Sequence, residues 1–190
     1  MEAFLVSIGV VALAEIGDKT QLLALVLATR FRRPLPIIAG IFGATLCNHA
    51  LAGLAGTYIS AFLSGPWMRW ALGLSFLAMA VWALIPDKLA KGRTFPGERY
   101  GVFPATLIAF FLIEIGDKTQ IATVALAAQY KALIAVVAGT TIGMLLANVP
   151  VVLLGDAAAA RLPLKAIRAA VAVLFVILAG LAVADVGLPF

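Results

Sequence analysis

The sequence Glu15-Ile16-Gly17-Asp18-Lys19-Thr20-Gln21 recurs without change as Glu114-Ile115-Gly116-Asp117-Lys118-Thr119-Gln120. Each copy lies in the middle of a long apolar segment. Because ionisable groups are costly to bury in hydrocarbon, an acidic cluster at such a depth indicates a functional site. If each copy is helical, its glutamate and aspartate lie on one face, about one turn apart. The chain therefore offers four carboxylates in two matched pairs.

The composition predicts an integral membrane protein. Of the 190 residues, 64% are hydrophobic and 12% are charged, whereas about a quarter of a soluble domain is charged. The basic residues lie in short loops and are not interleaved with aromatic side chains, so nucleic-acid binding is not expected. The one cysteine, Cys47, allows no intrachain disulfide, and we expect it to be a small buried apolar residue.

Six apolar segments are long enough to cross a bilayer. They are 4–29, 36–63, 67–85, 102–128, 132–155 and 164–184. We therefore predict an all-α integral membrane protein with six transmembrane helices. Residues 1–85 and 102–190 form its two halves, and the polar stretch 86–101 is the predicted cytoplasmic linker loop between them.

Lysine and arginine are concentrated in alternate loops. The first, third and fifth loops together carry ten of them, whereas the second and fourth carry only Arg69 and Lys131. The positive-inside rule therefore predicts that the odd-numbered loops are cytoplasmic and that both termini lie outside.

The internal repeat extends beyond the motif. Further identities between the halves are Ala39-Gly40 with Ala138-Gly139, Gly43 with Gly143, and Asn48 with Asn148. Because a repeat of three helices is odd in number, the second copy must enter the membrane from the opposite side. The sequence thus predicts two inverted-topology three-helix repeats, which commonly bind their substrate near the midplane where the repeats meet.

The charges of the motif indicate ion exchange. Four carboxylates cannot all remain ionised and unpaired in a low-dielectric site. Lys19 and Lys118 each follow their glutamate by four residues, the helical spacing for an ion pair, and offset two of the four charges. Either one divalent cation or two protons balances the two remaining negative charges. Metal and protons are therefore alternative occupants of one site.

Other side chains with oxygen atoms that can bind a metal lie near the four acids in the sequence. Besides Glu15, Asp18, Glu114 and Asp117, the candidate metal ligands are Gln21, Gln120, Asn48 and Asn148, with Thr20 and Thr119 in support. Such a set suits calcium, magnesium or manganese. For Gly17 and Gly116 two roles remain open, close helix approach or local unwinding. The two asparagines also fit interhelical hydrogen bonding, and His49 is either structural or a proton relay.

At these motifs the chain resembles a family of membrane cation/proton exchangers marked by two copies of E-x-G-D-[KR]-[ST]. Bacterial manganese exporters and chloroplast and Golgi manganese or calcium transporters belong to it. The resemblance covers essentially the whole chain. It implies that Glu15, Asp18, Glu114 and Asp117 form the cation site, and that Mn²⁺, or else Ca²⁺, moves against protons. The short chain resembles prokaryotic members, which implies a multi-pass protein of the plasma (inner) membrane.

The predicted function is secondary active transport that exports a divalent cation from the cytoplasm in exchange for protons. The predicted partners are the cation, protons and the lipid bilayer; no enzymatic activity and no resident cofactor are expected, and association as a homodimer is left open. One alternative is an intramembrane aspartyl protease, whose Gly-x-Gly-Asp signature is not met because Glu15 and Glu114 replace its first glycine. The other alternative is a cation channel with a symmetric acidic constriction.

Overall fold

The computed structural model describes residues 1–63, 65–86, 97–155 and 163–184, so most of the predicted linker lies outside the described residues. The described chain forms eight α-helices and one short 3-10 helix, which confirms the all-α class. The α-helices are α1 (Glu2–Glu15), α2 (Lys19–Phe31), α3 (Pro34–Phe62), α4 (Pro66–Ala83), α5 (Val102–Glu114), α6 (Lys118–Tyr130), α7 (Leu133–Leu154) and α9 (Leu164–Ala184). The 3-10 helix η1 (Glu98–Tyr100) precedes α5.

Both copies of the motif interrupt a helix. The segments 4–29 and 102–128, expected to be continuous, are split into α1 and α2 and into α5 and α6. Gly17 and Gly116 stand at the breaks with φ of 79° and 75°, a left-handed conformation that a continuing right-handed helix does not contain. The prediction that the two acids of each motif share one helical face is therefore wrong. Of the two roles considered for these glycines, the structure shows local unwinding.

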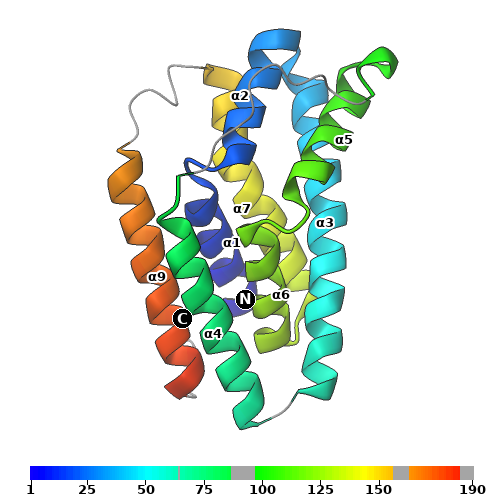
Figure 1. Ribbon diagram of the computed structural model, residues 1–190. Coiled ribbons are helices and arrows are strands. Elements are labelled where there is room, and N and C mark those ends of the chain that lie inside the picture. Colours follow the sequence, from blue (N-terminus) through cyan, green and yellow to red (C-terminus); the bar gives the residue numbers. More distant parts are fainter. Residues whose placement is uncertain (64, 87–96, 156–162, 185–190) are drawn as a thin grey trace.

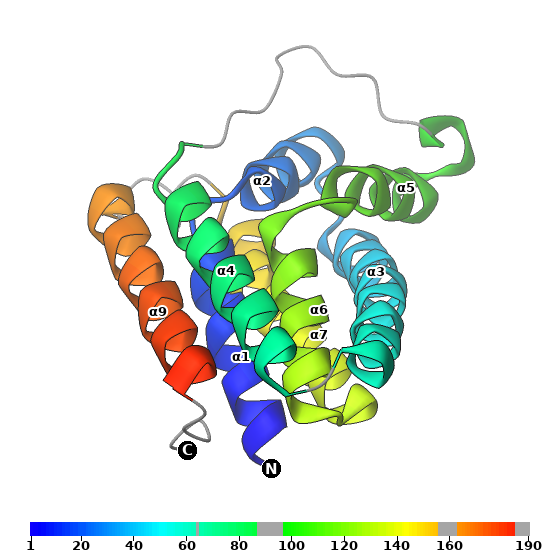
Figure 2. The same ribbon diagram turned by 60° about the horizontal axis from the view of Figure 1, so that its bottom comes forward.

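The acids at the two breaks are buried, and the two broken segments run in opposite directions. In Figure 1, α1 rises to its break and α2 continues above it, whereas α5 descends to its break and α6 continues below it. Seen from below in Figure 2, α2 and α5 lie side by side at one end of the molecule, and these two helices are in contact.

Matching local signals end the half-helices and begin the long helices. Arg32 and Lys131, 99 positions apart, follow α2 and α6 with φ of 53° and 51°, a left-handed C-terminal cap that lets the chain reverse. Pro34 and Pro66 stand in the first turn of α3 and α4, where proline's fixed φ and missing N–H cost nothing. The turns that follow α2 and α6, one in each half, therefore share their geometry.

The halves pack on each other in a crossed arrangement, α1 against α7 and α5 against α3. A Cβ added at Gly40 would lie 2.7 Å from Cβ of Thr106, and one added at Gly139 would lie 2.8 Å from Cβ of Ser7. Since Gly139 and Thr106 are the 99-residue equivalents of Gly40 and Ser7, the same close crossing is built twice. Small residues allow such approach between apolar helices.

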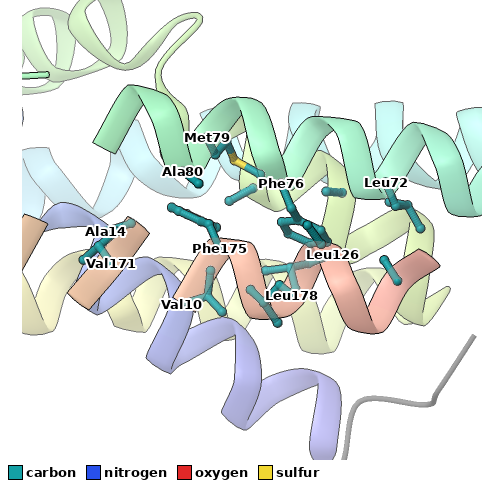
Figure 3. Close-up of a cluster of buried hydrophobic side chains, with 14 of the residues drawn as sticks. Val10, Ala14, Leu72, Phe76, Met79, Ala80, Leu126, Val171, Phe175 and Leu178 are labelled. Carbon is teal, nitrogen blue, oxygen red and sulfur yellow. The ribbon is translucent and has the colours of Figure 1, made fainter. Parts of the chain in front are cut away.

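The third helices of the two halves, α4 and α9, also pack together. Figure 3 shows Phe76 of α4 against Phe175 of α9, with ring centroids 6.4 Å apart and an interplanar angle of 23°. Val10 of α1 and Leu126 of α6 belong to the same buried cluster. Aromatic pairs at this spacing add a modest stabilisation to area burial, so this cluster holds α4 and α9 against the broken helices.

Among the described residues, three helices are long and apolar enough to cross a membrane by themselves. They are Pro34–Phe62, Leu133–Leu154 and Lys165–Ala184. The half-helix Val102–Glu114 is apolar but short, because the break at the motif divides its segment. The structure thus supports a membrane protein, and the number of spans remains part of the proposal below.

Cys47 is exposed, so the prediction that it is buried is wrong. Its neighbours on α3, Asn48 and His49, are fully buried. Residues on opposite sides of a helix are only one or two positions apart in sequence, and Cys47 falls on the side of α3 that faces away from the interior.

Candidate metal centre

The two breaks bring acids of both motifs together. Glu15, Asp18 and Asp117 each offer one carboxylate oxygen, and these three atoms lie within 4.8 Å of one another. All three side chains are buried, with at most 1% of their surface exposed. Glu114 is equally buried but is not a member of this group of three. Three of the four predicted acids therefore lie together, and they come from both repeats.

At each break, the glutamate lies at the C-terminus of one helix and the aspartate lies at the N-terminus of the next. Glu15 and Glu114 are the last residues of α1 and α5, and Asp18 and Asp117 are the N-caps of α2 and α6. The N-terminus of a helix carries a partial positive charge that stabilises an aspartate, and its C-terminus carries a partial negative charge that favours a cation. Discontinuous helices in transporters use their ends in this way.

The lysines of the motifs pair across the two halves. Lys19 Nζ lies 3.0 Å from Asp117 Oδ1, and Lys118 Nζ lies 2.9 Å from Asp18 Oδ2. The expectation that each lysine pairs with the glutamate four residues before it is wrong, because the helix that this spacing assumes is interrupted at Gly17 and Gly116. Four acids against two lysines still leave two negative charges if all six groups are ionised.

The asparagines bind the glutamate of the opposite half. Asn48 Nδ2 donates to Glu114 Oε2 at 3.0 Å, and Asn148 Nδ2 donates to Glu15 Oε1 at 3.2 Å. In the described structure the amide oxygen of each asparagine is buried and has no hydrogen-bond partner. Both asparagines thus make the interhelical bonds considered above, and each also presents a free acceptor inside the site.

The glutamines of the motifs accept hydrogen bonds from the backbone at the breaks. Gln21 Oε1 accepts from the backbone N–H of Gly17 at 2.9 Å, and Gln120 Oε1 accepts from that of Gly116 at 2.7 Å. Gln21 also donates to the carbonyl of Ala147 on α7 at 3.1 Å. Because unwinding frees backbone N–H groups that must find partners, both glutamines satisfy the backbone at the breaks, and their role as metal ligands stays a prediction.

The threonines of the motifs are buried beside the acids. Thr119 Oγ1 donates to Asp117 Oδ2 at 3.3 Å, whereas the hydroxyl of Thr20 has no partner among the described residues. His49 Nε2 lies 3.7 Å from Glu114 Oε1, and neither ring nitrogen makes a hydrogen bond to a described residue. The structure leaves both roles considered for His49 open.

Thr45 is a functional candidate that the sequence did not single out. Its hydroxyl donates to Glu114 Oε1 at 3.1 Å, and the side chain is fully buried. The available signal was its position three residues before Asn48, on the same face of α3. It was missed because the second repeat carries leucine, Leu145, at the corresponding place before Asn148.

Comparisons with known proteins show which family the chain belongs to. The family model described as "Divalent cation/proton antiporter GDT1" matches residues 3–91 and 102–187. A Vibrio cholerae protein named "Putative manganese exporter" is 57% identical over 180 residues, which are 94% of this chain and 89% of that protein. A GDT1-like protein of Synechocystis is 29% identical over 94% of this chain and 95% of its own length.

A third relative, the "Divalent cation/proton antiporter GDT1" of Saccharomyces cerevisiae, is 35% identical over 77 residues, 40% of this chain and 27% of that protein. No solved structure matches the chain. The family model covers both halves and includes both motifs. The chain therefore belongs to the GDT1 family of divalent cation/proton antiporters, a family of transporters and not of enzymes.

Proposed function

We propose that this protein exports a divalent cation, Mn²⁺ or else Ca²⁺, from the cytoplasm in exchange for protons at the acidic cluster between the two helix breaks. The observation that carries the proposal is the set of buried carboxylate oxygens from Glu15, Asp18 and Asp117 within 4.8 Å of one another. Carboxylate oxygens at this spacing suit a hard divalent cation. The family supports a divalent cation as cargo, and the name of the Vibrio cholerae relative supports manganese.

Charge balance supports exchange rather than simple binding. The two negative charges that the lysines leave are matched by one divalent cation or by two protons. Since the ion requires deprotonated carboxylates, metal affinity falls as pH falls. A site facing an acidic exterior therefore takes up protons and releases metal, whereas a site facing the cytoplasm does the reverse.

The proposed architecture is a six-span protein of a prokaryotic plasma membrane, made of two inverted three-helix repeats with both termini outside. Each broken helix pair, α1 with α2 and α5 with α6, then counts as one span, and α3, α4, α7 and α9 are the others. The crossed packing of α1 on α7 and α5 on α3 supports this pairing of repeats. Inverted repeats with broken helices suit alternating access to a central site.

The test is transport by the purified protein in liposomes that contain a pH-sensitive dye and a metal-sensitive dye. An inward Mn²⁺ gradient is expected to drive protons outward, and a proton gradient is expected to drive Mn²⁺. Glu15→Gln is the inactive control, because it removes a charged ligand with little change in volume. Mn²⁺ flux that neither saturates nor moves protons would instead identify a channel, and cleavage of a transmembrane peptide would identify a protease.

A further inference from the structure

The two motif glutamates have different surroundings although the motifs themselves are identical. Glu114 uses both carboxylate oxygens, because Oε1 accepts from Thr45 and Oε2 accepts from Asn48. Glu15 Oε1 accepts from Asn148, while Glu15 Oε2 is buried and has no partner among the described residues. Both oxygens of Glu114 therefore have a hydrogen-bond partner, whereas one oxygen of Glu15 has none among the described residues.

The difference originates in the long helices. On α3, Thr45 stands three residues before Asn48 and shares its face, so both side chains reach Glu114. On α7 the residue three positions before Asn148 is Leu145, which has no polar hydrogen to donate. The repeat that is exact in the motifs thus differs in the helices that pack on them, by the hydroxyl of Thr45 and by the imidazole of His49, which is replaced by Val149 in α7.

The glutamate with the free oxygen belongs to the group of three acids. A buried acceptor without a partner costs free energy unless something binds it, and Glu15 belongs with Asp18 and Asp117 to the set whose oxygens lie within 4.8 Å. Two oxygens on opposite sides of a calcium-sized ion are up to about 5 Å apart. One cation can therefore contact all three carboxylates with little movement of their side chains.

We propose that the cation is bound in this conformation by Glu15, Asp18 and Asp117, and that Thr45 is a positioning residue that holds Glu114 out of this ligand set. The inference rests on the proposed function, since it divides roles within the same site. It predicts that the two glutamates, equivalent by sequence, contribute unequally to binding. A symmetric four-acid site predicts equal contributions.

The first experiment is isothermal titration of the purified protein with Mn²⁺ at fixed pH. Glu15→Gln is expected to weaken binding at least about tenfold, because it removes one of three charged ligands, whereas Glu114→Gln changes affinity less than about threefold. Equal losses in the two variants overturn the inference and leave the proposed function standing. Wild-type protein that binds neither Mn²⁺ nor Ca²⁺ overturns the proposed function itself.

The second experiment examines Thr45 with a coupled pair of variants. Thr45→Val keeps the shape but removes the donor to Oε1, so it is expected to leave Glu114 held by Asn48 alone, free to turn toward the ion, and to tighten Mn²⁺ binding several-fold. In that background Glu114→Gln is expected to weaken binding, although it does not in the wild type. The difference between these two effects of Glu114→Gln is the coupling energy that a double-mutant cycle measures, and a merely structural role for Thr45 does not produce it.

Two further variants complete the design. Thr45→Ser retains the hydroxyl and is expected to restore wild-type affinity. Thr123→Val removes an equally buried hydroxyl that bonds only the carbonyl of Thr119 in its own helix, and it is expected to leave Mn²⁺ affinity unchanged. If Thr45→Val also leaves affinity unchanged, or if Thr45→Ser fails to restore it, the positioning role is wrong.

Discussion

Lys19 Nζ lies 3.0 Å from Asp117 Oδ1, so the ammonium group of one motif neutralises an acid of the other motif. Lys118 and Asp18 make the reciprocal pair at 2.9 Å. Each half of the chain thus supplies the countercharge for the other half. A bound cation adds positive charge to aspartates that already have ammonium partners, so the lysines set how much charge the site can still accept.

The first prediction concerns the pH dependence of metal binding. Lys19→Gln removes one positive charge and leaves the acids with a larger net negative charge, so they retain protons up to a higher pH. Because Mn²⁺ competes with those protons, the pH at half-maximal Mn²⁺ binding is expected to move upward. Titration of wild type, Lys19→Gln and the charge-conserving Lys19→Arg at several pH values checks this, and superimposable curves for the first two would contradict it.

The second prediction concerns stability. The side chain of Lys118 is 6% exposed and that of Lys19 is 22% exposed, so Lys118 neutralises its aspartate in a drier environment. Removing one partner of a buried ion pair costs about 3–5 kcal/mol, and solvent reduces this cost for Lys19. In melting curves followed by tryptophan fluorescence, Lys118→Gln is expected to lower the transition temperature more than Lys19→Gln does. The reverse order would mean that burial does not govern these pairs.

The third prediction concerns the backbone of the break. An alanine Cβ at Gly116 meets nothing within 4 Å, but φ at this position is +75°. Gly116→Ala is therefore expected to cost about 1–2 kcal/mol through backbone strain alone and to impair transport. Gly180→Ala is the matched control, because Gly180 lies inside α9 and its Cβ would also meet nothing, so alanine there is neutral or stabilising. Equal effects of the two substitutions on stability would be evidence against strain at the break.

The fourth prediction tests whether Gln21 stabilises the break or binds the ion. Gln21→Leu leaves the N–H of Gly17 without its acceptor, which costs about 1–3 kcal/mol. We expect a lower melting temperature and, in the folded protein, Mn²⁺ affinity close to that of the wild type. The combination is measured by melting curves and isothermal titration on the same preparation. A large loss of affinity with unchanged stability would instead identify Gln21 as a metal ligand.

The fifth prediction is topological and follows from the distribution of basic residues among the loops. In a Cys47→Ala background, Tyr100→Cys should react with an impermeant thiol reagent only from the cytoplasmic side, and Trp67→Cys only from outside. Both native side chains are well exposed, at 67% and 77%. Labelling of intact cells and of inverted vesicles checks both positions, and labelling of the two from the same side would exclude the proposed inverted arrangement.

The amino-acid sequence by itself determined the helical class, the duplicated acidic motif and the six apolar segments. Two expected features assumed a continuous helix. One was the shared face of Glu15 and Asp18, and the other was the pairing of Lys19 with Glu15. Both were wrong for one reason, the left-handed glycine at the centre of the motif. The sequence showed that Gly17 allows either close helix approach or unwinding, and it could not choose between them.

Only the tertiary structure decided which side chains meet. The pairing of Lys19 with Asp117 and of Asn48 with Glu114 depends on α5 packing against α3 and on the breaks facing each other. The unequal bonding of Glu15 and Glu114 likewise comes from Thr45, which stands 69 positions before Glu114 in the sequence. Spacing along a chain specifies neighbours within one helix, whereas the partners of a buried charge are set by which helices pack together.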